Sequence, residues 1–143
     1  MSAKWSLTFA VLNTRTRTSG FAVGATEADL RAACARGTVA VWAPYTLVAG
    51  RTDLEESWRL TSDSLALWLA ARIGAARCYL IKSILRQGAR LSAEQLARDG
   101  VVDHAFPAML KDAGVSTFLL GRGDQQAFIA ALAGVEGCGA TID

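Results

Sequence analysis

Residues 61–83 read TSDSLALWLAARIGAARCYLIKS and contain the clearest helix and the clearest strand of the chain. The hydroxyl residues at positions 61 and 62 can cap a helix, and Asp63 suits its first turn, where a negative charge complements the helix dipole. Apolar residues spaced three and four positions apart then share one helix face, and they are Leu65, Trp68, Leu69 and Ile73. Gly74 ends the predicted helix, since glycine readily adopts the left-handed conformation that closes helices.

The helix is followed by Cys78–Ile81, a wholly apolar run that predicts a strand covered on both faces, as in parallel sheets. Val39–Trp42 and Val115–Leu120 have the same character, and we expect all three to be central strands. Caps, apolar faces and closing glycines predict further helices at Thr26–Gly37, Ala93–Arg98, Phe106–Ala113 and Asp124–Ala133. The remaining segments are predicted as strands at Leu7–Leu12 and Ala140–Ile142, a loop or irregular hairpin at Asn13–Gly24, and an irregular surface excursion at Thr46–Leu60.

Strands that alternate with helices indicate an α/β fold. We expect a three-layer α/β/α sandwich with a mainly parallel sheet. The length of 143 residues is suited to one folded domain, so residues 1–143 are interpreted as a single domain.

The composition argues against several classes of protein. With 52% hydrophobic and 20% charged residues, the chain is an ordinary globular protein. Its net charge of +2 is too small to indicate nucleic-acid binding. No apolar run reaches the roughly 18 residues of a membrane helix, and the start does not have the order of a signal peptide, so we expect no membrane association and a cytoplasmic location. The cysteines predict neither a zinc site nor disulfides, because they are few and far apart: Cys34, Cys78 and Cys138.

One group of residues has the composition of a ligand site, although the standard nucleotide-binding and hydrolase motifs do not occur. Ser62-Asp63-Ser64 begins the predicted helix, and Lys82-Ser83 ends the strand that follows it. Ligands of open α/β sheets bind beyond the carboxyl ends of the strands. Amides at the helix start can hold anionic oxygens, a lysine can neutralise phosphate, and an aspartate can orient a lysine or hold magnesium. The alternative is purely structural, with Asp63 as a helix cap and Lys82 as a solvated strand end.

The order of these residues resembles the amino-acid kinase superfamily, which includes uridylate, acetylglutamate and aspartate kinases. The likeness is greatest to the branch that includes the aminomethylfuran phosphate kinase of methanofuran biosynthesis, and it covers about residues 35–143. The segments that carry it, besides residues 61–83, are Trp42-Ala43-Pro44-Tyr45, Ser57-Trp58, Val101-Val102-Asp103, Phe106-Pro107 and Gly139-Ala140-Thr141-Ile142.

This resemblance implies ATP-dependent phosphoryl transfer to a small-molecule substrate, with Mg²⁺, in methanofuran- or methylofuran-type one-carbon cofactor biosynthesis. Asp63 would correspond to the catalytic aspartate that organises active-site lysines. Ser62 and Ser64 would lie near the acceptor or the transferred phosphate, and Lys82 and Ser83 would border the nucleotide. The resemblance implies no metal-ligating residue of the chain's own.

The part of the chain before Ala35 departs from the family pattern, because it lacks the adjacent glycines of the family's phosphate-binding loops. Leu85-Arg86-Gln87-Gly88 also stands where an Asp-Gly pair is common in the family. We therefore expect a shortened version of the fold that forms a homo-oligomer or a complex with a kinase-like partner, which would cover exposed edges and apolar surface. Three functions stay open: a kinase that acts alone or with a partner chain, a noncatalytic kinase-like subunit that scaffolds or regulates a related enzyme, and a small-ligand-binding module.

Overall fold

A computed structural model describes residues 10–11 and 20–143 of the chain. Residue contacts group the chain into two compact units, Met1–Thr52 and Asp53–Asp143. Helices occur in both units, and most strand pairs within them are parallel. These features confirm the predicted α/β class and its mainly parallel pairing. The three-layer sandwich stays a prediction for the chain as a whole.

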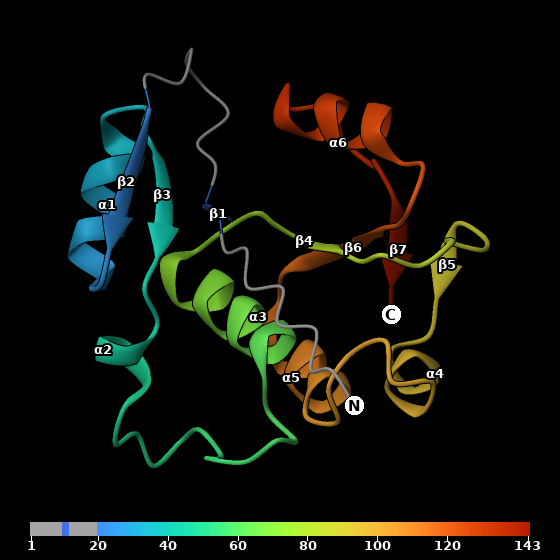
Figure 1. Ribbon diagram of the computed structural model, residues 1–143, viewed down its shortest axis with the longest axis horizontal. Helices are drawn as coiled ribbons and strands as arrows, with labels where there is room; N and C mark the ends of the chain where they lie inside the picture. Colours follow the sequence, from blue (N-terminus) through green and yellow to red (C-terminus); the bar gives the residue numbers. More distant parts are fainter. Residues whose placement is uncertain (1–9, 12–19) are drawn as a thin grey trace. The chain divides into compact units, whose positions relative to one another are not determined.

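The first unit contains a three-stranded sheet and one helix packed on it (Figure 1). Strand β3 (Val39–Trp42) lies between β1 (Ala10–Val11), which is antiparallel to it, and β2 (Phe21–Gly24), which is parallel. Helix α1 (Glu27–Ala35) connects β2 to β3, and the one-turn helix α2 (Tyr45–Val48) follows β3.

Helix α1 begins at its predicted cap. Thr26 Oγ1 accepts a hydrogen bond from the Asp29 N–H at 3.2 Å, and Asp29 Oδ2 accepts one from the Thr26 N–H at 3.0 Å, so the two residues form a capping box. Gly37 follows the end of the helix with a φ of 71°, as predicted. A Cβ atom on Gly24 would lie 2.8 Å from Leu30 Cδ2, which explains why a glycine ends β2 where α1 crosses it.

A loop or irregular hairpin was predicted at Asn13–Gly24, and residues 13–19 of this range lie outside the described residues. The prediction is wrong at its end, because Phe21–Gly24 forms strand β2, which is parallel to β3. Glycines at both ends of this short segment favour a loop locally, but pairing with β3 overrides that preference. The excursion predicted at Thr46–Leu60 begins within α2 and is otherwise without regular structure. The strand predicted at Leu7–Leu12 is observed at Ala10–Val11, and the rest of that range lies outside the described residues.

The second unit is organised around a four-stranded sheet in the order β4-β6-β7-β5. Strand β4 (Arg77–Ile81) is parallel to β6 (Ser116–Leu120), and β7 (Ala140–Ile142) is antiparallel to β6 and parallel to β5 (Arg90–Leu91). The short strand β5 was not predicted, since two residues are too few to produce a hydrophobic pattern.

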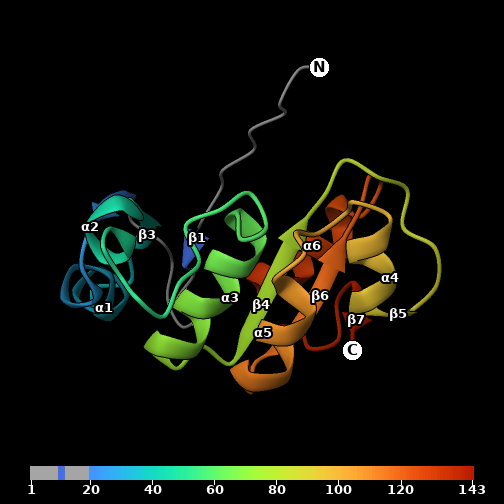
Figure 2. The ribbon, with the colours of Figure 1, turned by 90° about the horizontal axis from the view of Figure 1, so that it is seen from below.

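Helices lie on both faces of this second sheet. Helix α3 (Ser62–Ile73), α4 (Ala93–Arg98) and α5 (Phe106–Ala113) cover one face, and α6 (Gln125–Leu132) covers the other (Figures 1 and 2). These elements confirm the helices predicted for this unit. The core between the sheet and the first three helices includes Leu67, Ala70, Cys78, Leu80, Leu96, Phe106 and Leu119.

Strand β4 lies at one end of the described sheet, so the prediction that Cys78–Ile81 is a central strand is wrong for this sheet. Its apolar residues have another explanation. Cys78 and Leu80 belong to the core beneath α3, and on the opposite face the Tyr79 ring stacks on Phe118 with ring centroids 5.2 Å apart. An end strand that is covered on both faces has the same apolar sequence as a central one.

Candidate active site

Asp63 is carried into the interior by the buried face of α3. Asp63, Leu67 and Ala70 are spaced four and three residues apart, so they lie on one side of the helix, and Leu67 and Ala70 pack in the core. The Asp63 residue is consequently only 9% exposed. Its position in the first turn brings a carboxylate to the end of the helix where the helix dipole favours negative charge.

Lys82 follows the carboxyl end of β4 and continues its pairing, because its N–H donates to the Leu120 carbonyl at 2.9 Å. Successive side chains of a strand point to opposite faces. Cys78 and Leu80 point to the face that α3 covers, and Lys82 has the same parity. The lysine side chain is therefore directed to the side of the sheet on which Asp63 lies.

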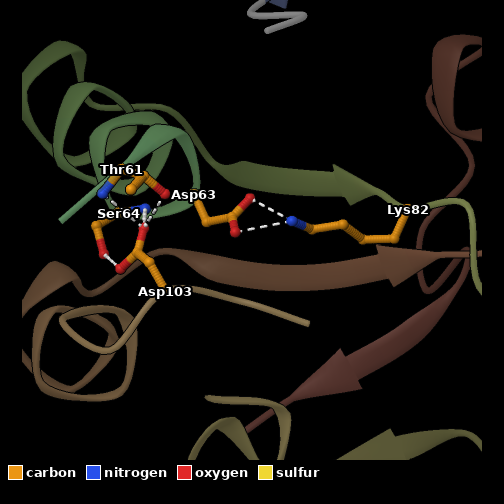
Figure 3. Close-up of polar contacts among 5 residues, drawn as sticks. All are labelled: Thr61, Asp63, Ser64, Lys82 and Asp103. Carbon is orange, nitrogen blue, oxygen red and sulfur yellow. Dashed lines mark hydrogen bonds and ion pairs between the residues drawn. The ribbon is translucent and has the colours of Figure 1, made fainter. Parts of the chain in front are cut away.

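The two residues form an ion pair. Lys82 Nζ lies 2.7 Å from Oδ1 and 2.7 Å from Oδ2 of Asp63 (Figure 3). The exposed fractions are 24% for the lysine side chain and 12% for the aspartate side chain. The pair is thus largely shielded from water, yet the ammonium group is not sealed off. In this structure Asp63 does more than cap a helix, and Lys82 is not a freely solvated strand end.

Burial determines the electrostatics of this pair. Loss of hydration raises the pKa of Asp63 above its ordinary value, the hydrogen bond and charge of Lys82 lower it in part, and the negative charge of Asp103 raises it again. Burial, together with the charge of Asp63, raises the pKa of the nearby Cys78 thiol to about 12. The thiol is therefore neutral at physiological pH and is not an activated nucleophile.

Asp103 is the residue of this site that sequence reasoning missed. It lies between α4 and α5, and its Oδ2 accepts hydrogen bonds from Thr61 N at 3.0 Å, Thr61 Oγ1 at 3.1 Å and Ser64 N at 3.0 Å. Its Oδ1 accepts a bond from Ser64 Oγ (Figure 3). In the sequence, Asp103 belongs to a segment that resembles the family. Its role was not evident, because capping residues are usually sought within a few positions of the helix start.

The predicted serines occupy different environments. Ser64 is completely buried and bonded to Asp103, so its hydroxyl and its amide are not available to a ligand. Ser62 is half-buried at the helix start, and Ser83 is exposed beyond β4. The structure therefore brings Asp63 and Lys82 into contact and directs Ser64 inward. Ser83 follows Lys82 directly in the sequence and is exposed.

The loop after β6 is bonded to the loop after β4. Arg122 donates from its N–H to the Ile84 carbonyl at 2.7 Å and from Nη2 to the Ser83 carbonyl at 3.1 Å. A Cβ atom on Gly121 would lie 2.6 Å from the Ile84 carbonyl oxygen, so only glycine allows this approach without rearrangement. The carboxyl ends of two adjacent parallel strands thus form one connected edge beside Lys82.

A second ion pair fixes the far side of these loops. Arg86 binds Asp124 with Nε at 2.8 Å and Nη2 at 3.1 Å, and the Gly121 N–H donates to the same carboxylate at 2.8 Å. The Arg86 guanidinium, followed by the Gly121 N–H, lowers the pKa of Asp124 to about 2. Asp124 thereby binds the two loops and leaves the start of α6 without a side-chain cap.

A concave region lies away from this ion pair, between α4, α5 and β7, and is lined by residues such as Pro107, Leu110 and Val115. Among the described residues, no group of three or more His, Cys, Asp or Glu side chains could hold a metal ion. Within the same part of the chain, no helix is long and apolar enough to cross a membrane. The sequence matches no protein-family model and no curated protein.

Proposed function

We propose that this chain is a phosphotransferase of the amino-acid kinase type, which transfers a phosphoryl group from ATP to a small molecule. The observation that carries the proposal is the shielded contact between Asp63 and Lys82, at the carboxyl edge of parallel strands. That edge is where α/β proteins bind nucleotides and other anionic ligands. A carboxylate that orients a lysine there is suited to hold a cation against phosphate oxygens.

Each residue would have a defined task in this reaction. ATP would supply the phosphoryl group, and Lys82 and Ser83 would contact its phosphates. Asp63 would orient the Lys82 ammonium through the contacts that both of its carboxylate oxygens make with Nζ. Phosphoryl transfer depends mainly on such positioning and charge stabilisation.

The residues present fit a magnesium ion that arrives with the nucleotide. Both Asp63 oxygens contact Lys82, and no cluster of three potential metal ligands occurs in the described part of the chain. Mg²⁺ commonly binds substrate phosphates, water and few protein groups, and in that state it neutralises phosphate charge. No protein residue is therefore assigned to the ion.

Access supports a site that is open from the strand side. Lys82 keeps about a quarter of its side chain exposed, as the 24% value shows, and Ser83 and Arg122 are exposed next to it. The Arg122 guanidinium, 3.1 Å from the Ser83 carbonyl, would add a second positive charge beside the phosphates. The acceptor would be a small molecule, as in the one-carbon cofactor pathways that the sequence resemblance suggests.

A second candidate function is a noncatalytic kinase-like subunit. It is favoured by one specific observation: the cation of the site is already paired with Asp63, and the helix start is already occupied by Asp103. Such a subunit would bind a related, longer enzyme and would not bind ATP. If the chain acts without such an enzyme, we propose that it forms a homo-oligomer.

Isothermal titration calorimetry with Mg²⁺–ATP tests these alternatives. We expect the wild type to bind and Lys82→Ala to lose about 1–3 kcal/mol of affinity, the range for hydrogen bonds to charged groups. Lys111→Ala is the matched control, since Lys111 is 71% exposed and lies on α5 beside Glu94. Equal affinity of the wild type and Lys82→Ala for Mg²⁺–ATP would show that Lys82 does not contact the nucleotide. No binding by the wild type, alone or with a kinase-like partner, would refute the kinase proposal.

A further inference from the structure

The carboxylate of Asp103 occupies the amino end of α3 from a distant part of the chain. The residues that bind it, Thr61 and Ser64, are 42 and 39 positions away in sequence. Thr61 stands at the N-cap position, but its side chain makes no capping bond of its own and donates to Asp103 instead. Asp103 therefore caps the helix, because it accepts hydrogen bonds from amides that would otherwise need water or a ligand.

The attachment is reinforced by the backbone. The Ala105 N–H donates to the Arg59 carbonyl at 2.9 Å, so the segment that leads into α5 runs against the segment that leads into α3. The side-chain bonds of Asp103 and the backbone bond of Ala105, two residues later, together fix the start of the helix to this loop.

Asp63 lies directly between the two residues that Asp103 holds. With Thr61 and Ser64 bound on either side, the backbone of Asp63 has little freedom to rotate about the helix start. Figure 3 shows the Asp63 side chain directed toward Lys82, while the Asp103 carboxylate faces Thr61 and Ser64. Thr61 and Ser64 supply four donors to the Asp103 carboxylate, and Lys82 supplies the cation to the Asp63 carboxylate.

This division has a consequence for ligands. Amino ends of helices commonly bind phosphate through free amides and the helix dipole. Here an internal carboxylate already occupies that place, and a second anion beside it would be repelled. A phosphate group can therefore approach Lys82 only from the strand side, where Ser83 is exposed.

We propose that Asp103 is the positioning residue of this site: by binding the start of α3 it holds Asp63 against Lys82 and directs anionic ligands to the strand end. The second part rests on the proposed function, whereas the first does not. Asp103 acts through Asp63 and touches neither substrate nor nucleotide.

The test measures the coupling between Asp63 and Lys82 by a double-mutant cycle, in the wild type and again with Asp103→Ala. We expect the coupling to fall to less than half in the Asp103→Ala background. Asp103→Asn is the second variant, because it keeps the shape and can still accept from the two amides but cannot accept from Ser64 Oγ through its amide nitrogen. Asp99→Ala is the matched control, since Asp99 is an exposed carboxylate nearby whose contact is with Gln95.

Formate provides a chemical rescue, because a small carboxylate can refill the position that Asp103→Ala vacates. Formate should restore at least half of the lost coupling in Asp103→Ala and leave Asp99→Ala unchanged, with sodium chloride at equal ionic strength as the control. A residue that merely stabilises the fold would lower the melting temperature and leave the coupling intact, and that outcome would overturn the proposal.

Carbon-13 NMR of the Asp63 carboxyl group is the second readout. Its neighbours with charge or a titratable group are Lys82 and Cys78 from β4 and Asp103 from its loop. Asp103→Asn removes the Asp103 charge, which by itself lowers the pKa of Asp63, and keeps most bonds to the helix start. Asp103→Ala removes the same charge and also loosens the Lys82 contact, so the pKa of Asp63 should be higher in Asp103→Ala than in Asp103→Asn, and equal titrations would count against the proposal. Neither readout uses a nucleotide, so a loss of coupling in a protein that never binds ATP would refute the kinase function and leave the positioning role established.

Discussion

Replacing Lys82 by methionine tests the energetics of the ion pair most directly. Methionine keeps most of the length of the lysine side chain and removes its charge, so Asp63 is left as a shielded carboxylate without its cation. Exposed ion pairs contribute about 0.2–1 kcal/mol, and removing one partner of a fully buried pair costs about 3–5 kcal/mol. With side chains 24% and 12% exposed, Lys82 and Asp63 lie between these limits. We expect Lys82→Met to lower the free energy of unfolding by roughly 2–3 kcal/mol at neutral pH.

Asp63→Asn should behave differently. The pKa of Asp63 is raised even though Lys82 is present, which means that the loss of hydration outweighs what the lysine returns. The amide keeps the shape without a buried charge, so we expect this variant to lie within about 1 kcal/mol of the wild type. The double variant should be close to Asp63→Asn, which gives a coupling of about 2–3 kcal/mol between the two side chains.

Urea denaturation of the four proteins at neutral pH and at about pH 4 measures this coupling. Lys82→Met raises the pKa of Asp63 further, because it removes the charge that lowered it. Acid then protonates Asp63 and relieves the unpaired charge, so the defect of Lys82→Met should be full at neutral pH and should shrink as the pH falls through the raised pKa. A coupling below about 0.5 kcal/mol at neutral pH, or a defect that does not change with pH, would refute the reasoning.

Two further predictions concern the loops beside the site. The pKa of Asp124 is lowered to about 2 from 3.8. Its ionised form therefore stabilises the fold above the unfolded pKa, and this contribution is lost as the pH falls toward the folded pKa. The stability difference between the wild type and Asp124→Asn should be constant above about pH 5 and should vanish between about pH 4 and 2. A difference that persists unchanged to the lowest pH would contradict this, as measured by urea denaturation across the pH range. Gly121→Ala should displace the Ser83–Arg86 loop, since its Cβ would lie 2.6 Å from the Ile84 carbonyl oxygen, and should cost about 1–3 kcal/mol of stability. Gly123→Ala is the control, because a Cβ atom on Gly123 would meet no atom within 4 Å, although its φ of 95° adds backbone strain. Equal chemical-shift changes at Ser83 in both variants would refute the steric argument.

The sequence was informative where local pattern and tertiary environment agree. Helix α3 was predictable because Asp63 in the first turn, the apolar stripe after it and Gly74 all indicate one helix. The proximity of Asp63 and Lys82 was predicted from their places at a helix start and a strand end. The helix face that the sequence indicated, Leu65, Trp68, Leu69 and Ile73, is however not the face on which Leu67 and Ala70 pack in the core beside Asp63. The predicted active-site pair therefore coincides with an observed contact, while the function assigned to it stays a proposal.

The misses have a common physical cause, which is that contacts between distant segments leave no local pattern. Asp103 caps a helix whose first residues lie about forty positions before it, so no capping rule that looks three residues ahead could find it. Strand β2 contains a glycine because α1 crosses it closely, and the same glycine suggested a loop. The end position of β4 was hidden because α3 and the ring pair of Tyr79 with Phe118 cover both of its faces.

The energetic balance at Asp63 also bears on whether the pair is structural or functional. A shielded ion pair is seldom the most stable choice, because apolar residues of similar size often stabilise such a position better. Leu67 and Ala70 show that this face of α3 packs well with apolar side chains one and two turns further on. A carboxylate with a raised pKa, on a helix start that Asp103 binds and directed to a lysine at the carboxyl edge of parallel strands, is the type of group that is enriched at functional sites. Under the proposed function, the contact between Asp63 and Lys82 would serve a ligand that needs an oriented positive charge, and this would account for an ion pair at a position where an apolar residue would also pack.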